Sequence, residues 1–220
     1  MEHTISGVGV LDKSLRVLDA VAEADGPCTL AELVDLTDLP KATAHRLAAA
    51  LEVHGLLRRD PEGRYLLGVR LIGLGRAAAE DWPLAEAARP ALEALRADTG
   101  ESVQLYRRDG DHRVCVVSLE SPHELRTIVH QGARLPLGVG SAGRILVGEA
   151  PAEPWTASVG ERAPGVASVS APVVVDGRLV AAVGISGPVG RLGDHPGEHH
   201  GPAVARAAEA ISAAASLVGG

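Results

Sequence analysis

An ordered series of helix start and stop signals between residues 29 and 55 constrains the fold more than any other feature of the chain. Thr29, with Glu32 three residues later, has the pattern of a capping box, in which each residue satisfies a free backbone N–H at a helix start. Pro40 stands where the first residue of a second helix is expected, and Gly55 stands where that helix ends. The series predicts a short helix, a turn and a second helix.

The segments on either side extend this pattern into a small domain. Upstream, apolar residues recur at helical spacing over residues 10–24 and predict a first helix, with one stripe formed by Leu11, Leu15, Leu18, Val21 and Ala22. Downstream, two short strand-like runs flank the turn sequence Asp60-Pro61-Glu62-Gly63 and predict a β-hairpin. Three helices followed by a hairpin form a winged helix-turn-helix, so we expect residues 1–68 to be a DNA-binding domain.

The charge pattern supports this assignment locally. The net charge of −7 excludes a generally basic, nucleic-acid-coating protein, yet residues 40–70 carry six cations against three anions. The helix that follows Pro40 has an apolar stripe formed by Ala44, Leu47, Ala48 and Leu51, so its polar face points outward. In a winged helix-turn-helix, such a polar face contacts the base edges, and cations on the hairpin contact the phosphates. The expected DNA-binding residues are Lys41, Ala42, Thr43, His45 and Arg46 on the helix, and Arg58, Arg59 and Arg64 on the hairpin.

Composition narrows the classes of function that remain. Aromatic residues make up 2% of the chain and Phe is absent, so binding of single strands by base stacking is not expected. Cys28 and Cys115 lie among apolar residues and are expected to be buried thiols in a reducing cytosol. No apolar run reaches the roughly 18 residues of a membrane span, and residues 1–9 do not resemble a signal peptide. We therefore expect a cytoplasmic protein without a membrane partner.

The second half of the chain predicts an α+β domain after a linker. Residues 69–81 and 83–100 have helical periodicity, with Leu71, Leu74 and Ala78 on one side of the first helix. Two hairpins are expected around Asp109-Gly110 and Asp176-Gly177, and a last helix from Pro202. The region between the hairpins, 120–168, is predicted to be rich in loops. The expected domains are thus 1–68, a linker helix at 69–82, and a second domain at 83–220.

Several sequence motifs together resemble the IclR family of bacterial regulators. They are Leu39-Pro40-Lys41-Ala42-Thr43-Ala44-His45-Arg46-Leu47, Leu51-Glu52-x-His54-Gly55-Leu56, Arg64-Tyr65-x-Leu67-Gly68, Gly165-Val166-Ala167-Ser168 and Gly184-Ile185-Ser186-Gly187-Pro188. The resemblance implies a GAF-like effector-binding domain and dimers or tetramers that bind operator DNA, in the manner of a ligand-responsive repressor. The similarity is greatest to actinobacterial members linked to amino-acid metabolism. One departure is that residues 150–158 lack most of a helical segment common in the family, so the ligand pocket is expected to differ there.

The effector site is expected around residues 137–146. Ser141 and Ala142 stand where a helix begins, with Ser141 as its cap, and free N–H groups there favour an anion. Leu137 is expected to supply an apolar side, and the resemblance implies that Ser168, Gly184 and Ser186 form the opposite wall. These residues predict a small carboxylate such as an amino or keto acid. The alternative is that the serines are ordinary strand residues bonded to the backbone.

Two other patterns suggest chemistry that the context does not support. Gly138-x-Gly140-x-x-Gly143 matches a dinucleotide fingerprint, but residues 134–137 are too short for the strand that it needs. Asp194, His195, Glu198, His199 and His200 are metal-ligand types, but Pro196 and Gly197 predict a solvated loop there. We therefore expect neither cofactor, metal nor enzymatic activity. The rival interpretations are an enzyme using the 138–143 loop, and an adaptor whose winged helix binds protein.

Overall fold

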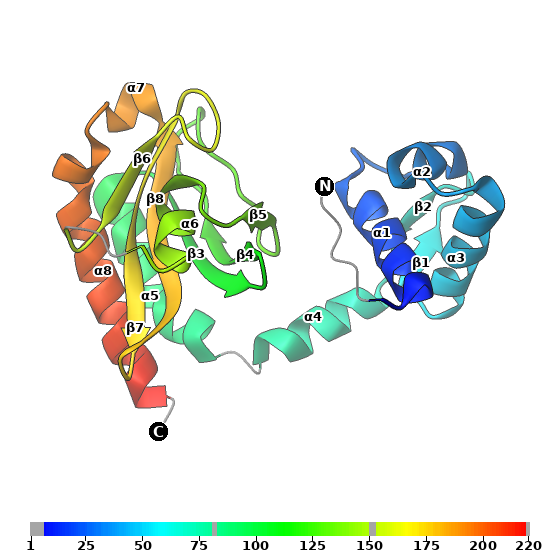
Figure 1. Cartoon of the computed structure of the whole chain (residues 1–220), viewed down its shortest axis with the longest axis horizontal. Coiled ribbons are helices and arrows are strands. Elements are labelled where there is room, and N and C mark those ends of the chain that lie inside the picture. Colours follow the sequence, from blue (N-terminus) through cyan, green and yellow to red (C-terminus); the bar gives the residue numbers. More distant parts are fainter. Residues whose placement is uncertain (1–6, 81–82, 150–152, 219–220) are drawn as a thin grey trace. The chain divides into compact units, whose positions relative to one another are not determined.

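The chain folds into two compact units, Met1–Asp81 and Trp82–Gly220. The computed structural model shown in Figure 1 describes residues 7–80, 83–149 and 153–218. The first unit holds helices and a hairpin, and the second holds helices around a single sheet. The predicted α+β class, a helix-turn-helix unit followed by a sheet domain, is confirmed. None of the described helices is both long enough and apolar enough to cross a membrane.

The first unit consists of three helices and a two-stranded wing, followed by a fourth helix. Its elements are α1 (Gly9–Glu23), α2 (Leu30–Thr37), α3 (Lys41–Val53), β1 (Leu57–Arg59), β2 (Tyr65–Leu67) and α4 (Arg70–Glu80). The predicted capping box is present at α2, since the Thr29 N–H donates to the Glu32 carboxylate at 2.8 Å and the Glu32 N–H donates to the Thr29 hydroxyl at 3.2 Å. Val17, Leu33, Leu47, Leu57 and Tyr65 are buried in one core, which fixes α3 against the wing.

Two details of this unit differ from the sequence prediction. The stripe on α1 is not uniformly buried: Leu11 and Leu15 are 50% and 49% exposed, whereas Val17, Ala20 and Val21 form the core face. The N-terminal part of α1 therefore leaves apolar surface uncovered by its own unit. Pro40 has an extended ψ of 136° and caps α3 from outside, so the helix begins at Lys41. A proline fits this position because its missing N–H has no helical partner to lose.

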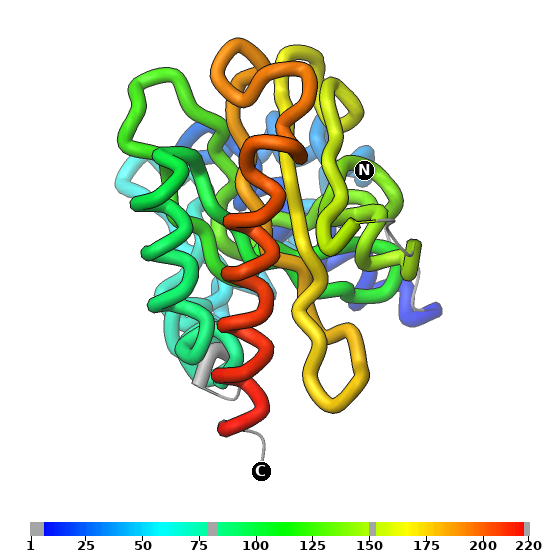
Figure 2. The backbone as a smooth tube through the Cα atoms, turned by 90° about the vertical axis from the view of Figure 1, so that its left-hand side faces the viewer, coloured from blue at the N-terminus to red at the C-terminus, as the bar shows by residue number. Residues whose placement is uncertain are grey.

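The second unit is built on a six-stranded antiparallel sheet in the order β5-β4-β3-β8-β7-β6. Its strands are β3 (Ser102–Asp109), β4 (His112–Leu119), β5 (Arg134–Pro136), β6 (Thr156–Val159), β7 (Val166–Val175) and β8 (Arg178–Pro188). Its helices are α5 (Pro83–Thr99), α6 (Gly140–Leu146), α7 (Val189–Leu192) and α8 (Pro196–Val218). Helices α5 and α8 run side by side across one face of the sheet (Figure 2).

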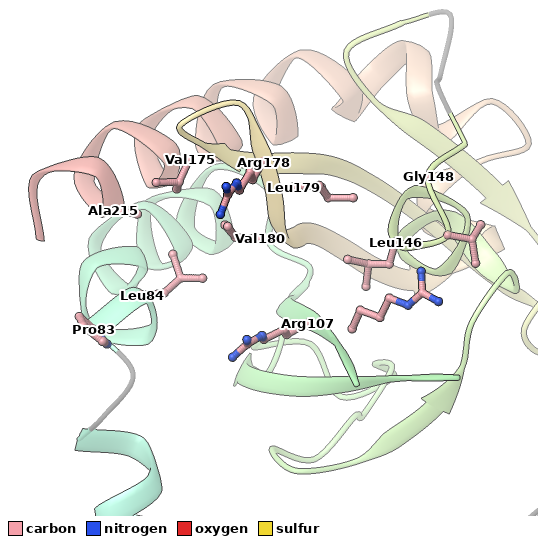
Figure 3. A pocket seen from close by; sticks show the side chains of 12 residues that line it. Pro83, Leu84, Arg107, Leu146, Gly148, Val175, Arg178, Leu179, Val180 and Ala215 are labelled. Carbon is pink, nitrogen blue, oxygen red and sulfur yellow. The ribbon is translucent and has the colours of Figure 1, made fainter. Parts of the chain in front are cut away.

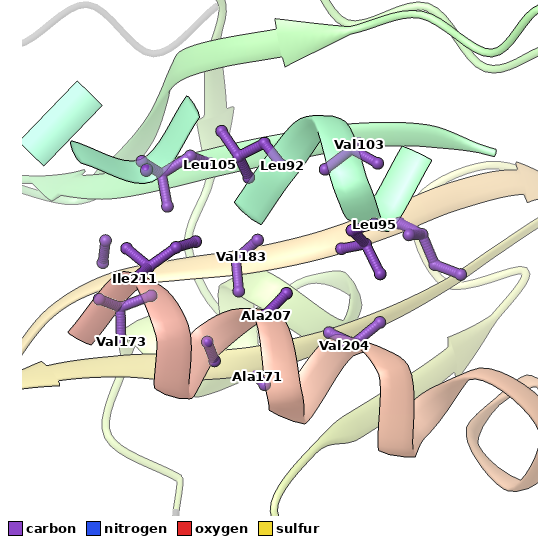
Figure 4. Packing of buried hydrophobic residues seen from close by; sticks show 14 of the residues in the cluster. Leu92, Leu95, Val103, Leu105, Ala171, Val173, Val183, Val204, Ala207 and Ile211 are labelled. Carbon is purple, nitrogen blue, oxygen red and sulfur yellow. The ribbon is translucent and has the colours of Figure 1, made fainter. Parts of the chain in front are cut away.

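The main core lies between this helix pair and the sheet (Figure 4). Leu92 and Leu95 of α5 and Ile211 of α8 pack against Leu105 and Val183 of the central strands. A smaller core lies under α6 and includes Tyr106, Cys115 and Ile145. The sheet therefore carries α5 and α8 on one face and a polar site beneath α6 on the other.

The solvated loop predicted around Pro196 and Gly197 is wrong, because both residues belong to a helix. Helix α8 begins at Pro196 rather than Pro202, and α7 precedes it. Proline is well tolerated in the first turn of a helix, so Pro196 starts α8 instead of breaking it. Gly197 and Gly201 face Trp155 so closely that an added Cβ would lie 3.0 Å and 2.2 Å from the indole. These glycines are therefore packing positions rather than helix breakers.

The region 120–168 is also more regular than predicted. It contains β5, α6 and β6, and β7 already begins at Val166. Short edge strands carry little periodicity, which is why the sequence pattern missed them. The shortened segment 150–158 falls partly outside the described residues, because 150–152 are not described. The effect of this shortening on the pocket stays a prediction.

Candidate functional sites: an exposed helix face and a buried polar cavity

The polar face of α3 is exposed, as the sequence predicted. Lys41, Ala42, His45 and Arg46 are exposed and Thr43 is half-buried, while Ala44, Leu47, Ala48 and Leu51 are buried. Because α3 packs on α1, α2 and β1 through its apolar stripe, the opposite side is free of its own unit. A helix with small and polar side chains on its free face has the shape and chemistry to enter a major groove.

The wing arginines are not equivalent. Arg59 Nε lies 3.1 Å from the Glu52 carboxylate, and its guanidinium lies 4.8 Å from the centre of the Tyr65 ring. Arg64 pairs with Asp60 at 2.7 Å and with Glu62 at 3.2 Å. The hydrogen bond to Asp60 raises the pKa of Arg64 above its ordinary value. Arg58 is exposed and has no ion-pair partner in the described part of the chain. The three acidic residues of this segment therefore engage two of the three predicted phosphate-binding cations.

The second site is a small polar cavity in the C-terminal unit, which we call the serine–arginine cavity. Three serines meet there, since Ser141 Oγ lies 2.8 Å from Ser168 Oγ and 2.8 Å from Ser170 Oγ. Ser186 donates to Gln104 Oε1 at 3.0 Å. The lining residues come from β3, β4, α6, β7, β8 and the loop after β6, and are Gln104, Tyr106, Arg113, Gly140, Ser141, Ala142, Arg162, Ser168, Ser170, Gly184, Ile185 and Ser186.

Arg113 supplies positive charge to this cavity from within the protein. Its side chain is only 3% exposed, its guanidinium lies 5.4 Å from the Tyr106 ring centre, and Nη1 donates to the carbonyls of Pro136 and Val139, the latter at 2.7 Å. Burial lowers the pKa of Arg113, and the charge of Arg162 acts in the same direction. An arginine remains protonated even so, because its ordinary pKa is far above neutrality.

Two buried donors at this cavity have no acceptor. Among the described residues, the buried side-chain nitrogens without a hydrogen bond are Arg16 Nε, Gln104 Nε2 and Arg113 Nε. The last two belong to residues that line the serine–arginine cavity. A buried donor without a partner costs about 1–3 kcal/mol, so an acceptor group placed here would be stabilised. The cavity volume is about 20 Å³, enough for roughly one water molecule. A larger ligand therefore requires the lining to move.

Two glycines make room for this arrangement. A Cβ added at Gly143 would lie 2.4 Å from Arg113 Nη1, so the missing side chain lets the guanidinium approach α6. A Cβ at Gly184 would lie 2.2 Å from Ser170 Oγ and 2.5 Å from the Val169 carbonyl. The glycine-rich run 138–143 thus leaves room for the Arg113 side chain. This accounts for its glycines without a bound dinucleotide.

The predicted effector residues come together, with one exception. Ser141, Ala142, Ser168, Gly184 and Ser186 line the cavity, whereas Leu137 does not and packs beside the smaller core instead. The Ser141 hydroxyl hydrogen-bonds with those of Ser168 and Ser170. The sequence prediction missed Gln104, Tyr106, Arg113, Arg162 and Ser170. Polar Ser102 and Gln104 alternate with apolar residues on a strand that is wholly buried at its start, and this pattern could have indicated a polar site.

The predicted role of Ser141 as a helix cap is wrong. The N-cap of α6 is Val139, no side chain caps the helix, and Ser141 lies within the first turn. The Gly140 N–H donates to the Glu161 carboxylate at 3.1 Å, so an internal anion already occupies the position expected for a ligand. Arg144 is directed away into ion pairs with Glu149 at 2.8 Å and Glu161 at 3.5 Å. The positive charge at the cavity therefore belongs to Arg113 and Arg162, which line it, and not to the start of α6.

The remaining candidate groups have simple explanations. His199 and His200 lie on α8, and within the described ranges no group of three or more His, Cys, Asp or Glu side chains could hold a metal ion. Cys28 and Cys115 are buried and unpaired with each other, as predicted. Burial raises the pKa of the Cys115 thiol to about 12, so it is not a nucleophile at neutral pH.

Comparison with known proteins assigns both halves of the chain to the same group. Residues 10–61 match the IclR helix-turn-helix domain, and residues 76–154 match the bacterial transcriptional regulator IclR C-terminal domain. The HTH-type transcriptional regulator KipR of Bacillus subtilis is 36% identical over 125 residues, which is 57% of this chain and 50% of KipR. The chain thus spans about half the length of the curated relatives that it matches.

Solved structures match over nearly the full length. An IclR-family transcriptional regulator from Rhodococcus sp. is 30% identical, with 97% of this chain and 96% of that chain covered and a TM-score of 0.56. An IclR homologue from Microbacterium hydrocarbonoxydans, solved in complex with 4-hydroxybenzoate, is 20% identical, with 93% of this chain and 98% of that chain covered and a TM-score of 0.77. The similarity to the Microbacterium protein shows a shared fold. The related proteins are regulators rather than enzymes, so the alternative of an enzyme using residues 138–143 is not supported.

Proposed function

Because this chain belongs to the IclR family of bacterial transcription regulators, we propose that it binds double-stranded operator DNA and that a small carboxylate controls this binding. In this proposal residues 1–68 are the DNA-binding domain, 69–82 the linker helix and 83–220 the effector-binding domain, and the protein acts in the cytoplasm. The exposed α3 face, held rigidly by its buried stripe and followed by a cationic wing, is the observation that supports operator binding most strongly.

The roles of individual residues follow from their exposure. Lys41, Ala42, Thr43, His45 and Arg46 would contact base edges, because a recognition helix presents one face to the major groove. Arg58, Arg59 and Arg64 would contact phosphates, since cations beside the helix fix the register without reading sequence. Arg59 and Arg64 would exchange their internal carboxylate partners for phosphates. Arg58 has no such partner to lose within the described residues and is the stronger phosphate anchor in this proposal.

The proposed effector is a small acid such as an amino acid or keto acid. The serine–arginine cavity offers guanidinium groups from Arg113 and Arg162, hydroxyls from the three serines, and the unpaired Gln104 Nε2. Guanidinium and hydroxyl donors together match the two oxygens of a carboxylate. The 4-hydroxybenzoate bound by the Microbacterium homologue is also a carboxylate. On the resemblance of the sequence, we propose control of amino-acid or related small-acid metabolism.

We further propose that the working form is at least a dimer, either a dimer or a tetramer. One module makes a small contact, and two-fold proteins gain specificity by reading two half-sites. Helix α4 leaves Leu74 51% exposed and Ile72 74% exposed, and Leu71 is half-buried. These side chains, with Ala78, would be covered by a second copy. Light scattering at micromolar concentration would give at least twice the monomer mass, and a monomer would contradict this.

A gel shift with the DNA upstream of the protein's own coding sequence tests the function as a whole. The shift is expected with the upstream DNA, and pooled small metabolites are expected to change it. A shift with no preference for that DNA would leave only general electrostatic binding. No shift at all, with capture of a protein partner instead, would favour an adaptor.

A thermal-shift screen of amino and keto acids tests the effector site separately. A ligand that binds only the folded state raises the melting temperature. Ser141→Trp and Ser168→Trp fill the cavity and should abolish the shift, as should Arg162→Gln. Arg134→Gln is the matched control, because Arg134 is exposed on β5 and pairs with Asp109 at the surface at 3.4 Å. If a ligand raises the melting temperature equally in all four variants, it binds elsewhere.

A further inference from the structure

The C-terminal unit contains a second cavity, much larger than the first, at one end of its sheet (Figure 3). Its volume is about 640 Å³, within the range of small-molecule sites. It lies where the turns that join β3 to β4 and β7 to β8 meet the start of α5 and the end of α6. It shares no lining residue with the serine–arginine cavity. We call it the arginine-rimmed cavity.

Its walls are apolar. Leu84 of α5, Leu146 of α6, Leu179 and Val180 of β8 and Ala215 of α8 line it, and Figure 3 shows them surrounding a hollow. Leu179 is 39% exposed, and the neighbouring Val147 is 42% exposed. Apolar side chains that face a cavity and remain open to water gain free energy when an apolar group covers them. The walls therefore suit a hydrocarbon chain or ring.

Its rim is cationic. Arg107, Arg108 and Arg178 line the cavity, and none of the described lining residues is acidic. In Figure 3, Arg107 and Arg178 lie on different sides of the hollow, on β3 and at the start of β8. Arg108 Nε donates to the Gly110 carbonyl at 3.1 Å, which holds that side chain along the turn. Arg178 has no acidic partner among the described residues.

These two properties specify one class of ligand. An anion placed at this opening is attracted by the positive charges of the arginines that line it. Guanidinium groups bind carboxylate and phosphate oxygens through paired N–H donors. We propose that the arginine-rimmed cavity binds an amphiphilic anion, with an apolar body against Leu84, Leu146 and Leu179 and a carboxylate or phosphate at the arginines. This site is separate from the effector site proposed above and does not depend on DNA binding.

Calorimetric titration of the full chain tests this proposal with three probes of equal chain length: decanoate, decyl phosphate and decanol, each below its aggregation concentration. At least one anion is expected to bind saturably, and decanol about tenfold more weakly because it lacks the charge. The stronger of the two anions identifies the head group as carboxylate or phosphate. Equal binding of decanol and both anions, or no binding of any probe, would overturn the proposal.

Variants locate the bound probe. Arg178→Gln should weaken anion binding by about five- to tenfold and leave decanol unchanged, whereas Arg206→Gln, on an arginine of α8 with a 68% exposed side chain, should have no effect. Ala215→Trp should weaken the binding of all three probes, because the indole takes up part of the cavity. Ser141→Trp should leave it intact, because that residue lines the other cavity. Loss with Ser141→Trp but not with Ala215→Trp would place the probe in the serine–arginine cavity and overturn the proposal. A failed gel shift would have no bearing on these titrations.

Discussion

The two candidate sites, one in each unit, present their cationic side chains in opposite ways. On α3, Lys41 and Arg46 are exposed, whereas Arg113 in the sheet domain is 3% exposed. An exposed guanidinium keeps its hydration, so the α3 face is ready to meet a large polyanion without any change in the protein. A buried guanidinium has lost several kcal/mol of hydration, and carbonyls, an aromatic ring or an anion must compensate it. The first arrangement suits a rigid docking surface, and the second suits an internal site that takes up a small anion.

The compensation at Arg113 is incomplete, and under the proposed function this would favour a carboxylate over a neutral ligand. Nη1 has carbonyl partners and the guanidinium faces Tyr106, but Nε has no acceptor. Burial also raises the pKa of the Tyr106 phenol, so this ring remains neutral beside the cation. A carboxylate brings both charge and acceptors, whereas a neutral ligand brings at most acceptors. The difference between the two units therefore predicts that substituting an arginine has different consequences in each.

The largest expected effect is on the stability of the C-terminal unit. Arg113→Met retains apolar bulk but leaves the carbonyls of Pro136 and Val139 without a donor, so we expect the free energy of unfolding to fall by about 2–4 kcal/mol. Urea titration followed by circular dichroism measures this. Arg134→Met, at an exposed ion pair, is the control and should change the unfolding free energy by less than about 1 kcal/mol. Equal effects of the two variants would mean that the buried contacts of Arg113 contribute nothing.

For α3 we expect a loss of DNA binding without a loss of stability. Arg46→Ala should weaken operator binding by about 1–3 kcal/mol. The same change should leave the unfolding free energy nearly unaltered, because the side chain is exposed. Fluorescence anisotropy with labelled operator and a thermal melt measure the two quantities. If binding to specific and random DNA were both unchanged, α3 would not be the reading helix.

A smaller effect is expected at the helix that supports α3. Thr29→Ala removes the hydroxyl of the capping box and should reduce the unfolding free energy of the N-terminal unit by about 1 kcal/mol. Hydrogen bonds from Thr29 lower the pKa of Glu32. A carboxylate with a lowered folded pKa stabilises the protein above its unfolded pKa, and this contribution is lost as pH falls through the folded pKa. The difference between wild type and variant should therefore shrink in acid, and a difference that is constant from neutral to strongly acidic pH would contradict this account.

The smallest expected effect separates the wing cations. Arg58→Gln should lower the slope of log affinity against log salt by about 0.9, the value of one lost phosphate contact, and should weaken all sequences alike. Arg59→Gln should lower it less, because Arg59 must first release Glu52 at 3.1 Å. Replacing Arg64, which is held by Asp60 and Glu62, should resemble Arg59→Gln. A selective loss at one base position would show instead that the wing reads sequence.

The two units also differ in how far the sequence predicted them. The α3 face lies within six consecutive residues, so helical periodicity and charge were sufficient to predict which side chains are exposed. The cavity is assembled from Gln104, Arg113, Arg162 and Ser170, which lie on separate strands and loops that only the sheet pairing brings together. Arg113 lies on β4 in a run that otherwise reads as core strand. Local patterns could not predict its contact with α6, since that contact depends on the missing side chain at Gly143.

The most direct test of the central claim is the ratio of two affinities. The full chain is titrated, at one fixed salt concentration, into the DNA upstream of its own coding sequence and into a shuffled duplex of the same length and base composition. If α3 reads an operator there, the upstream duplex should bind about a thousandfold more tightly or better than the shuffled one. Equal affinities would mean that the exposed cations provide only general attraction to phosphates, and would contradict the assignment of this chain as an operator-binding regulator of its own upstream region.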